Sequence, residues 1–258
     1  MIKKVVQGIC LVLVIVLGFS FTVHAIGLEV ALGGWNQKPQ GDIGYKPISA
    51  NDSLDLERDL KYDTEFSPIG RVKIDMPLFL PNIYLMGTRC EFDGRGRRDV
   101  NFKFGDRIFT ANVDFYSKIK LNHYDIALYY GLPFLKKATA DMLNMEVGVN
   151  ARIVDFKAEV RQESMGIEES KSLTVPIPMV YIGAQFTPIE RLAIEAEGRG
   201  ISYSGNSLIS LIGRIKFKLM DPFFIAGGYR YDEIKIDEED IDAEVKFHGP
   251  FAEVGIQF

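Results

Sequence analysis

Strict alternation of apolar and polar residues is the feature that most constrains how this chain can fold. In segment after segment, apolar residues recur at every second position, which is the period of a β-strand and not of a helix. In 190–204, for example, Leu192 and Ile194 share one face while Glu195 and Glu197 share the other. We expect strands at 27–36, 66–76, 82–93, 117–131, 144–162, 172–186, 190–204, 207–219, 223–236 and 243–258.

The connectors between these strands are long and short almost in turn. The long, polar ones are 37–65, 94–116, 163–171 and 237–242, with 204–206 as a tight exception. The short ones are 77–82, 187–190 and 220–222, with 132–143 as a longer exception. Outer-membrane barrels show this asymmetry, with long loops outside and short turns in the periplasm. The pattern predicts an all-β fold: a closed, up-and-down antiparallel transmembrane β-barrel of about ten strands, in a range of roughly eight to twelve.

The N-terminal segment is typical of a cleaved secretory signal peptide. Lys3 and Lys4 precede an apolar run over 9–19, and 23–25 has the small-residue spacing of a cleavage site. An uncleaved anchor is the alternative, although a spanning helix needs roughly 20 apolar residues. We expect 1–25 to be removed and 26–258 to form the barrel domain. Removal of 1–25 takes away two lysines, so the 30 basic and 35 acidic residues become 28 and 35, a net charge of −7. A mildly acidic chain gives no case for binding nucleic acid.

The last strand, "FAEVGIQF", places Val254, Ile256 and Phe258 on one face. It resembles the C-terminal signature of bacterial outer-membrane barrels, in which a terminal aromatic residue is read by the barrel-assembly machinery. "GLEVALGGWNQKPQG", "FLPNIYL" and "NHYDIALYY" resemble a family of small, largely uncharacterised Gram-negative outer-membrane β-barrel proteins. The resemblance implies a location in the cell outer membrane, among lipid and lipopolysaccharide, and supplies no functional residues. A secreted soluble β-sandwich or lipocalin-like barrel stays open, because periodicity does not show which face meets solvent.

The charged faces of the strands predict a charged barrel interior. "ISYSGNSLI" suits a two-residue hairpin turn at Gly205-Asn206. That turn would place Glu197 opposite Arg214 and Glu195 opposite Lys216, all pointing inward, whereas a slip by one residue would send the charges to lipid. The other residues expected in the lumen are Arg71, Lys73, Arg152, Arg230 and Asp232.

Catalytic and metal-binding patterns are sparse. Neither His123 nor His248 has other metal-ligand residue types at a suitable spacing, so we expect no metal site and no cofactor. The basic stretch "GRGRR" over 94–98 is either a solvated loop or a contact with lipopolysaccharide phosphates. Its arginines are Arg95, Arg97 and Arg98.

Three functions fit these observations. The first is a small envelope barrel with a charged, plugged lumen in a structural or binding role. The second is a narrow channel or transporter for small solutes, lined by the same charges. The third is an outer-membrane enzyme with a site at the rim, near His248, Ser164 and Ser170. The absence of a concentrated catalytic constellation in the sequence counts against an enzyme.

Overall fold

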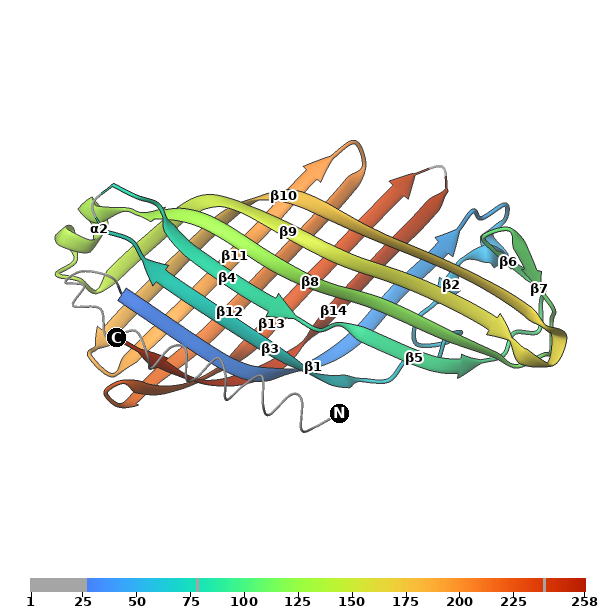
Figure 1. The fold of residues 1–258 in the computed structure, drawn as a ribbon, viewed down its shortest axis with the longest axis horizontal. Coiled ribbons are helices and arrows are strands. Elements are labelled where there is room, and N and C mark those ends of the chain that lie inside the picture. Colours follow the sequence, from blue (N-terminus) through green and yellow to red (C-terminus); the bar gives the residue numbers. More distant parts are fainter. Residues whose placement is uncertain (1–26, 78, 239) are drawn as a thin grey trace.

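The ten expected strands are present and pair in chain order around a closed barrel (Figure 1). The computed structural model describes residues 27–77, 79–238 and 240–258, so the predicted signal peptide, 1–25, lies outside the described residues. Each strand is antiparallel to the next, and the last closes on the first from Glu29↔Gln257 to Tyr45↔Ile241. The wall strands are β1 (Gly27–Tyr45), β3 (Glu65–Asp75), β4 (Asn82–Thr88) continued by β5 (Glu91–Gly96), β8 (Phe115–Gly131), β9 (Leu143–Gln162), β10 (Ile167–Ile189), β11 (Leu192–Tyr203), β12 (Asn206–Met220), β13 (Phe223–Glu238) and β14 (Ile241–Gln257).

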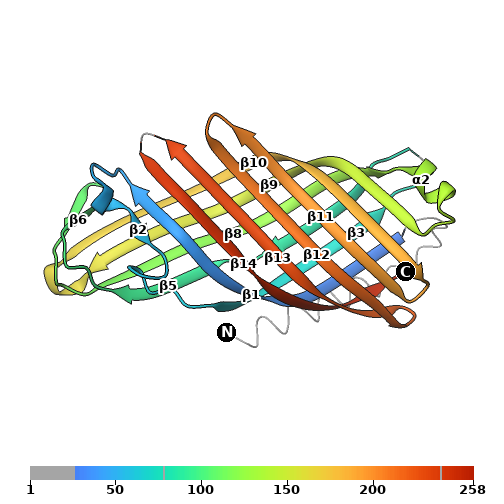
Figure 2. The same ribbon diagram turned by 180° about the vertical axis from the view of Figure 1, so that it is seen from behind.

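Small elements lie at the two ends of the barrel. The long-loop end carries η1 (Ala50–Asp52), β2 (Leu54–Asp55), the hairpin of β6 (Phe102–Phe104) with β7 (Arg107–Phe109), and η2 (Glu163–Met165). The short-turn end carries α2 (Pro133–Ala138) and both described ends of the wall, as Figure 2 shows from behind. No helix in the described part of the chain is long and apolar enough to span a membrane.

Two strands extend further toward the long-loop end than the sequence suggests. β1 continues to Tyr45, because its ladder with β14 persists up to that residue. β10 begins at Ile167, so the expected loop 163–171 shrinks to a tight connection ending at Gly166, whose φ is 64°. Many of these residues are polar, which is why the sequence predicts loops here. They are polar because the outer face of the strands at this end is polar.

The polarity of the two faces inverts along single strands. On β8 the outward residues of 124–130 are apolar, and the side chain of Tyr124 is 62% exposed. The inward residues beside them, His123 and Asp125, are buried. Further along, the outward residues of 116–122 are polar, while the inward residues are buried and, apart from Ser117, apolar, as Ile119 is. A soluble barrel would not expose the apolar face of 124–130, because it would turn that face inward.

The same inversion occurs on β9 and β14, and it divides the barrel into two parts. The belt segment, which includes 123–131, 143–153 and 249–257, has an apolar outer face and a polar interior. The outer segment, which includes 115–122, 154–162 and 241–248, has a polar outer face and an apolar interior. Exposed aromatic residues flank the belt segment at both edges, as in membrane barrels. They are Tyr130, Phe134, Phe186, Phe223 and Phe258 at the short-turn edge and Phe66, Tyr124, Tyr203 and Tyr229 at the other.

The loops fold into the outer segment and close it. Leu54, Leu56 and Leu60 of loop 46–64 are fully buried in the same apolar core as the wall residues. Gly96 faces inward from β5, and a Cβ atom there would lie 1.9 Å from the carbonyl oxygen of Asp59. The loop therefore packs against the inner face of the wall, at a position where only glycine leaves room.

Aromatic rings span the interior of the outer segment. Phe92 of β5 stacks on Phe247 of β14 with ring centroids 5.4 Å apart, and Tyr62 stacks on Phe92 at 6.2 Å. Phe102 of the β6–β7 hairpin packs against Phe115 of β8 at 5.1 Å. We call this buried cluster, together with the leucines of loop 46–64, the outer cap.

Asp52 joins the two loops of the outer cap. Its carboxylate accepts hydrogen bonds from the backbone N–H groups of Lys103 at 2.6 Å, Ser49 at 2.8 Å and Ile48 at 2.9 Å. Burial opposes ionisation of this carboxyl, but the N–H donors outweigh burial and hold the pKa of Asp52 below its ordinary value. The ionised form of Asp52 is therefore the one that stabilises the cap.

Candidate functional site

The four central charges expected in the lumen lie inside the belt segment and contact one another. Arg214 of β12 donates to Glu195 at 2.8 Å and to Glu197 at 2.7 Å, both on β11, and to Glu253 of β14 at 2.5 Å. Lys216 lies 2.8 Å from Glu195. All five side chains are buried. A guanidinium has five N–H donors in a fork, which suits it to bridge several carboxylates.

The predicted register of this hairpin is wrong by two residues. The turn is formed by Ser204 and Gly205, with φ values of 50° and 86°, instead of by Gly205-Asn206. Glu195, and not Glu197, is therefore the backbone partner of Arg214. A two-residue slip keeps every side chain on its face. The ion pairs of Glu197 with Arg214 and of Glu195 with Lys216 still form, but diagonally.

The cluster continues across the barrel to β1 and β3. Lys216 donates to Glu29 of β1 at 2.9 Å. Arg71 of β3 donates through Nε to Glu253 at 2.9 Å and forms an ion pair through Nη1 with Glu29. These contacts link residues that are 182 and 187 positions apart in the chain. They join β3 to β14 and β12 to β1, strands that are not neighbours in the wall.

A second cluster lies between these charges and the outer cap. Arg152 of β9 donates to both oxygens of Asp125 of β8, at 2.9 and 3.0 Å. Arg230 of β13 donates to Asp232 at 2.7 Å and hydrogen bonds to Nε2 of His123 at 2.9 Å. Arg230 also lies 4.5 Å from the ring centroid of Trp35. His123 is thus buried inside a structural cluster.

Several members of the interior were not singled out in the sequence. Arg199 lies between the rings of Tyr84 and Tyr181, at 4.8 and 5.2 Å, and donates to Glu197 at 3.2 Å. The others are Glu29, Asp125, Glu146 and Glu253. Alternation does place all of them on the inward face, but it does not show that their partners come from distant strands.

Acidic and basic side chains are equal in number in this interior network. The basic members among the described residues are Arg71, Lys73, Arg152, Arg199, Arg214, Lys216 and Arg230, each with an acidic partner. The acidic members are Glu29, Asp125, Glu146, Glu195, Glu197, Asp232 and Glu253. The seven positive and seven negative charges of this network cancel. The network therefore has no net charge that would attract cations or anions into the barrel.

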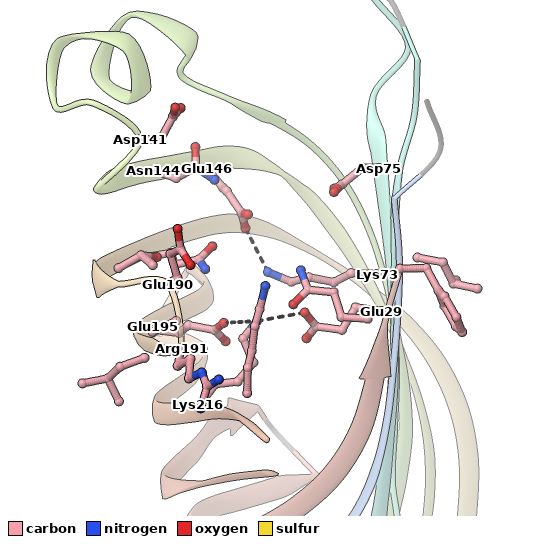
Figure 3. Close-up of a pocket in the computed structure, with 18 of the residues that line it drawn as sticks. Glu29, Lys73, Asp75, Asp141, Asn144, Glu146, Glu190, Arg191, Glu195 and Lys216 are labelled. Carbon is pink, nitrogen blue, oxygen red and sulfur yellow. Dashed lines mark hydrogen bonds and ion pairs between the residues drawn. The ribbon is translucent and has the colours of Figure 1, made fainter. Parts of the chain in front are cut away.

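A cavity of about 420 Å³ lies at the short-turn end of the interior (Figure 3). At its base Lys73 donates to Glu146 at 3.2 Å, and Glu146 accepts a hydrogen bond from Tyr181 at 2.7 Å. Lys216 and Glu29 form another part of the base. The rim is formed by the α2–β9 and β10–β11 turns and by the ends of β1, β3, β12 and β14.

The loop arginines lie at the far end of the barrel. Arg95 and Arg97 are exposed, whereas Arg98 donates to the carbonyl oxygens of Asn51 at 2.6 Å and Ser53 at 3.3 Å. Arg97, Arg98 and Arg58 line one open hollow. Arg98 is thus engaged in holding loop 46–64.

The residues of the expected assembly signal lie on the outer wall. Val254 is 63% exposed and Phe258 is 66% exposed on the apolar outer face, and Ile256 is half-buried on the same side. His248 hydrogen bonds to Tyr229 at 2.6 Å and to Gln40 at 3.0 Å.

The serines considered with His248 lie elsewhere. Ser164 is in η2 and Ser170 is on β10, whereas the hydrogen-bond partners of His248 are on β13 and β1. Among the described residues, no group of three His, Cys, Asp or Glu side chains is placed to hold a metal ion.

The sequence matches no protein-family model and no curated protein. Solved structures do resemble the chain. The outer membrane protease OmpT from Escherichia coli is 11% identical, with a TM-score of 0.52, and the match covers 93% of this chain and 99% of that one. The translocator domain of autotransporter NalP from Neisseria meningitidis is 9% identical, with a TM-score of 0.42 and coverage of 99% and 96%. Ail, the attachment invasion locus protein of Yersinia pestis, is 13% identical, with a TM-score of 0.38 and coverage of 91% and 100%. The closed barrel, its apolar belt and the likeness to OmpT show that the chain has the fold of an outer-membrane β-barrel.

Proposed function

We propose that this chain is an outer-membrane barrel whose interior is sealed to solutes and which serves a structural or binding role in the cell envelope. The observation that carries the proposal is the paired charge network. Arg71 of β3 and Arg214 of β12 both reach Glu253 of β14. Arg230 of β13 hydrogen bonds to His123 of β8, five strands away around the ten-strand wall, so side chains of opposite walls meet inside the barrel. A channel lined by the same charges would need them apart and hydrated.

The outer cap supplies a second barrier. Leu54, Leu56 and Leu60 are buried within it, and an apolar core of this kind excludes hydrated ions. A solute would have to displace both the cap and the ion pairs. Displacing the ion pairs costs much free energy, because separating a buried pair leaves each charge without its partner and without water.

The outer surface of the barrel fits a location in the outer membrane. The apolar outer face of the belt segment suits contact with lipid, because a closed barrel leaves no backbone edge unpaired there. The proposal includes export through a cleaved signal peptide at 1–25 and assembly through the face of Val254, Ile256 and Phe258. Exposed Arg95 and Arg97 lie at the long-loop end, where lipopolysaccharide phosphates would accept guanidinium donors.

Conductance in planar lipid bilayers tests the sealed interior. The refolded protein should insert and show no single-channel steps, while a general porin in the same bilayers conducts. Insertion is checked separately by gel mobility: a closed barrel migrates as a compact species before heating and more slowly after boiling. Reproducible conductance steps from the heat-modifiable species would contradict the proposal and support the narrow channel instead.

A further inference from the structure

The outer part of β10 is an open edge of the barrel wall. β10 pairs with β9 from Ile167↔Gln162 onward, but its ladder with β11 begins only at Val180↔Gly200. Figure 1 shows the β9–β10 hairpin continuing past the β11–β12 hairpin toward the long-loop end. Within the described part of the chain, no strand pairs with 167–179 on the side that faces away from β9.

This edge is accessible to solvent. The five consecutive residues from Ser170 to Thr174 are all exposed, and Leu173 is 47% exposed. The β6–β7 hairpin lies nearby, with Gly105 beside the side chain of Glu169, but its strands pair with each other and not with β10. The unpaired backbone groups of a strand edge are a template on which another strand can add.

Two prolines show which residues turn their backbone groups to the open side. Pro176 and Pro178 lie opposite Ile153 and Ala151 of β9. A proline has no N–H to donate, so it is tolerated in a strand where its nitrogen points away from the ladder. Every second residue before Pro176 points the same way. These residues are Glu168, Ser170, Ser172 and Thr174, and their N–H groups are free to pair.

The edge is complementary to itself. In an antiparallel pair of two such edges centred on Ser170, residues at equal distances on either side of the centre lie opposite each other. Glu169 then faces Lys171 of the second copy, and Lys171 faces Glu169. Ile167 and Leu173 face each other in the same way. Lys171 lies 5.9 Å from the ring centroid of Tyr45, and within the described residues neither it nor Glu169 has an ion-pair partner.

The neighbouring registers lack this complementarity. A centre on Lys171 would place two lysines opposite each other, and a centre on Glu169 would place two glutamates opposite each other. Like charges directly opposed across a ladder destabilise it. A centre on Ser172 would place Pro176 opposite Glu168, where the proline cannot donate the ladder hydrogen bond.

We propose that two copies of this chain associate through the open edges of β10, as an antiparallel pair centred on Ser170, with their barrels in two facing membranes. β10 runs from the long-loop end at Ile167 to the short-turn end at Ile189. The second strand runs the other way, so the belt segments of the two copies lie on opposite sides of the contact. Copies side by side in one membrane have β10 running in the same direction and cannot form this pair.

The contact is isologous, because each copy contributes the same patch. It rests on the proposed outer-membrane location and specifies the binding role of the barrel as adhesion between two cells.

Disulfide formation tests the register. Ser170→Cys should give a covalent dimer on a non-reducing gel after mild oxidation in detergent. The two copies of position 170 face each other with Cα atoms about 5.5 Å apart, within the range of about 4.4–6.8 Å that a disulfide spans. Ser172→Cys, an exposed change on the same face, is the matched control and should stay monomeric, because its two copies would lie about 13 Å apart along the strands. The wild-type protein, whose free Cys90 is buried, should also stay monomeric.

Charge reversal tests the pairing of Glu169 with Lys171. Glu169→Lys places two lysines opposite each other at both ends of the contact, and Lys171→Glu places two glutamates there. Each variant alone should self-associate about tenfold more weakly in analytical ultracentrifugation. An equimolar mixture of the two variants should associate as the wild-type protein does, because every pair then joins opposite charges. A general disturbance of the strand would not be rescued by mixing.

Vesicle clustering tests the arrangement in facing membranes. Lipid vesicles that carry the barrel with its long loops outward, verified by protease access, should cluster and raise the turbidity. Vesicles with Glu169→Lys should not cluster alone, but should do so when mixed with vesicles that carry Lys171→Glu. Heat-dependent gel mobility shows that each variant is folded.

The outcomes separate this inference from the proposed function. Absence of a covalent dimer from Ser170→Cys, or equal dimer yields from Ser172→Cys, would overturn the edge pairing. Failure of the mixed charge variants to associate would overturn it as well. Dimers in detergent without clustering of vesicles would overturn the facing-membrane arrangement. A sealed interior is measured by conductance, which none of these changes at the outer end of β10 alters.

Discussion

Arg214 is the side chain whose removal should be felt most strongly. It bridges Glu195, Glu197 and Glu253, and Arg214→Met keeps similar length while leaving the three carboxylates facing one another. Removing one partner of a buried ion pair costs about 3–5 kcal/mol of unfolding free energy. Glu253 keeps Arg71 as a partner, so we expect a loss near the lower end, about 3 kcal/mol.

Urea unfolding in lipid vesicles measures this loss. Trp35, the only tryptophan, is fully buried and donates to the carbonyl oxygen of Gly249 at 3.1 Å, so its fluorescence reports on the interior. Lys246→Gln, which breaks two solvent-accessible ion pairs, with Glu244 and with Glu233, is the control and should leave stability unchanged within error. The loss of unfolding free energy in Arg214→Met, relative to the wild-type protein, should become smaller in acid. Protonation then relieves the repulsion between the three carboxylates that have lost Arg214. A variant as stable as the wild-type protein at neutral pH would refute the idea that this network holds the walls together.

Other predictions concern assembly and the outer cap. Phe258→Asp should lower the amount of heat-modifiable barrel in outer-membrane fractions far more than Gln257→Asn, because position 258 faces outward; equal amounts would remove the proposed signal. Gly96→Val should displace loop 46–64, because the new Cβ would lie 1.9 Å from the carbonyl oxygen of Asp59. A protease should then cut the loop faster, while the compact, heat-modifiable species is still seen on the gel. The depressed pKa of Asp52 means that its stabilising effect is present above its ordinary pKa of 3.8 and lost as pH falls through the lower folded value. The protection factors of the loop amides, which compare exchange with the intrinsic rate at the same pH, should therefore fall in acid, and Asp52→Asn should lower them already at neutral pH. Unchanged protection factors would count against this role.

Much of the wall could be predicted from the sequence because strand geometry is local. Side chains alternate faces whatever the strand pairs with, so segments such as 190–204 and 207–219 and the shared face of Glu195 and Glu197 follow from spacing alone. The number of strands follows from the connectors between them. Arg214 and Lys216 were expected inside for the same reason, and the structure places them there.

Only the tertiary structure decided which face meets solvent at each level and which residues meet across the barrel. Periodicity gives identical patterns for 116–122 and 124–130 of β8, yet the two stretches have opposite polarity inside, because the loops bring apolar side chains into one end of the barrel and not the other. The turn places Ser204 at a positive φ, which turn preferences assign more readily to glycine. The predicted register of the hairpin was therefore wrong by two residues. The contact of Arg71 with Glu253 depends on closure of β14 on β1, a long-range event that neither segment encodes by itself.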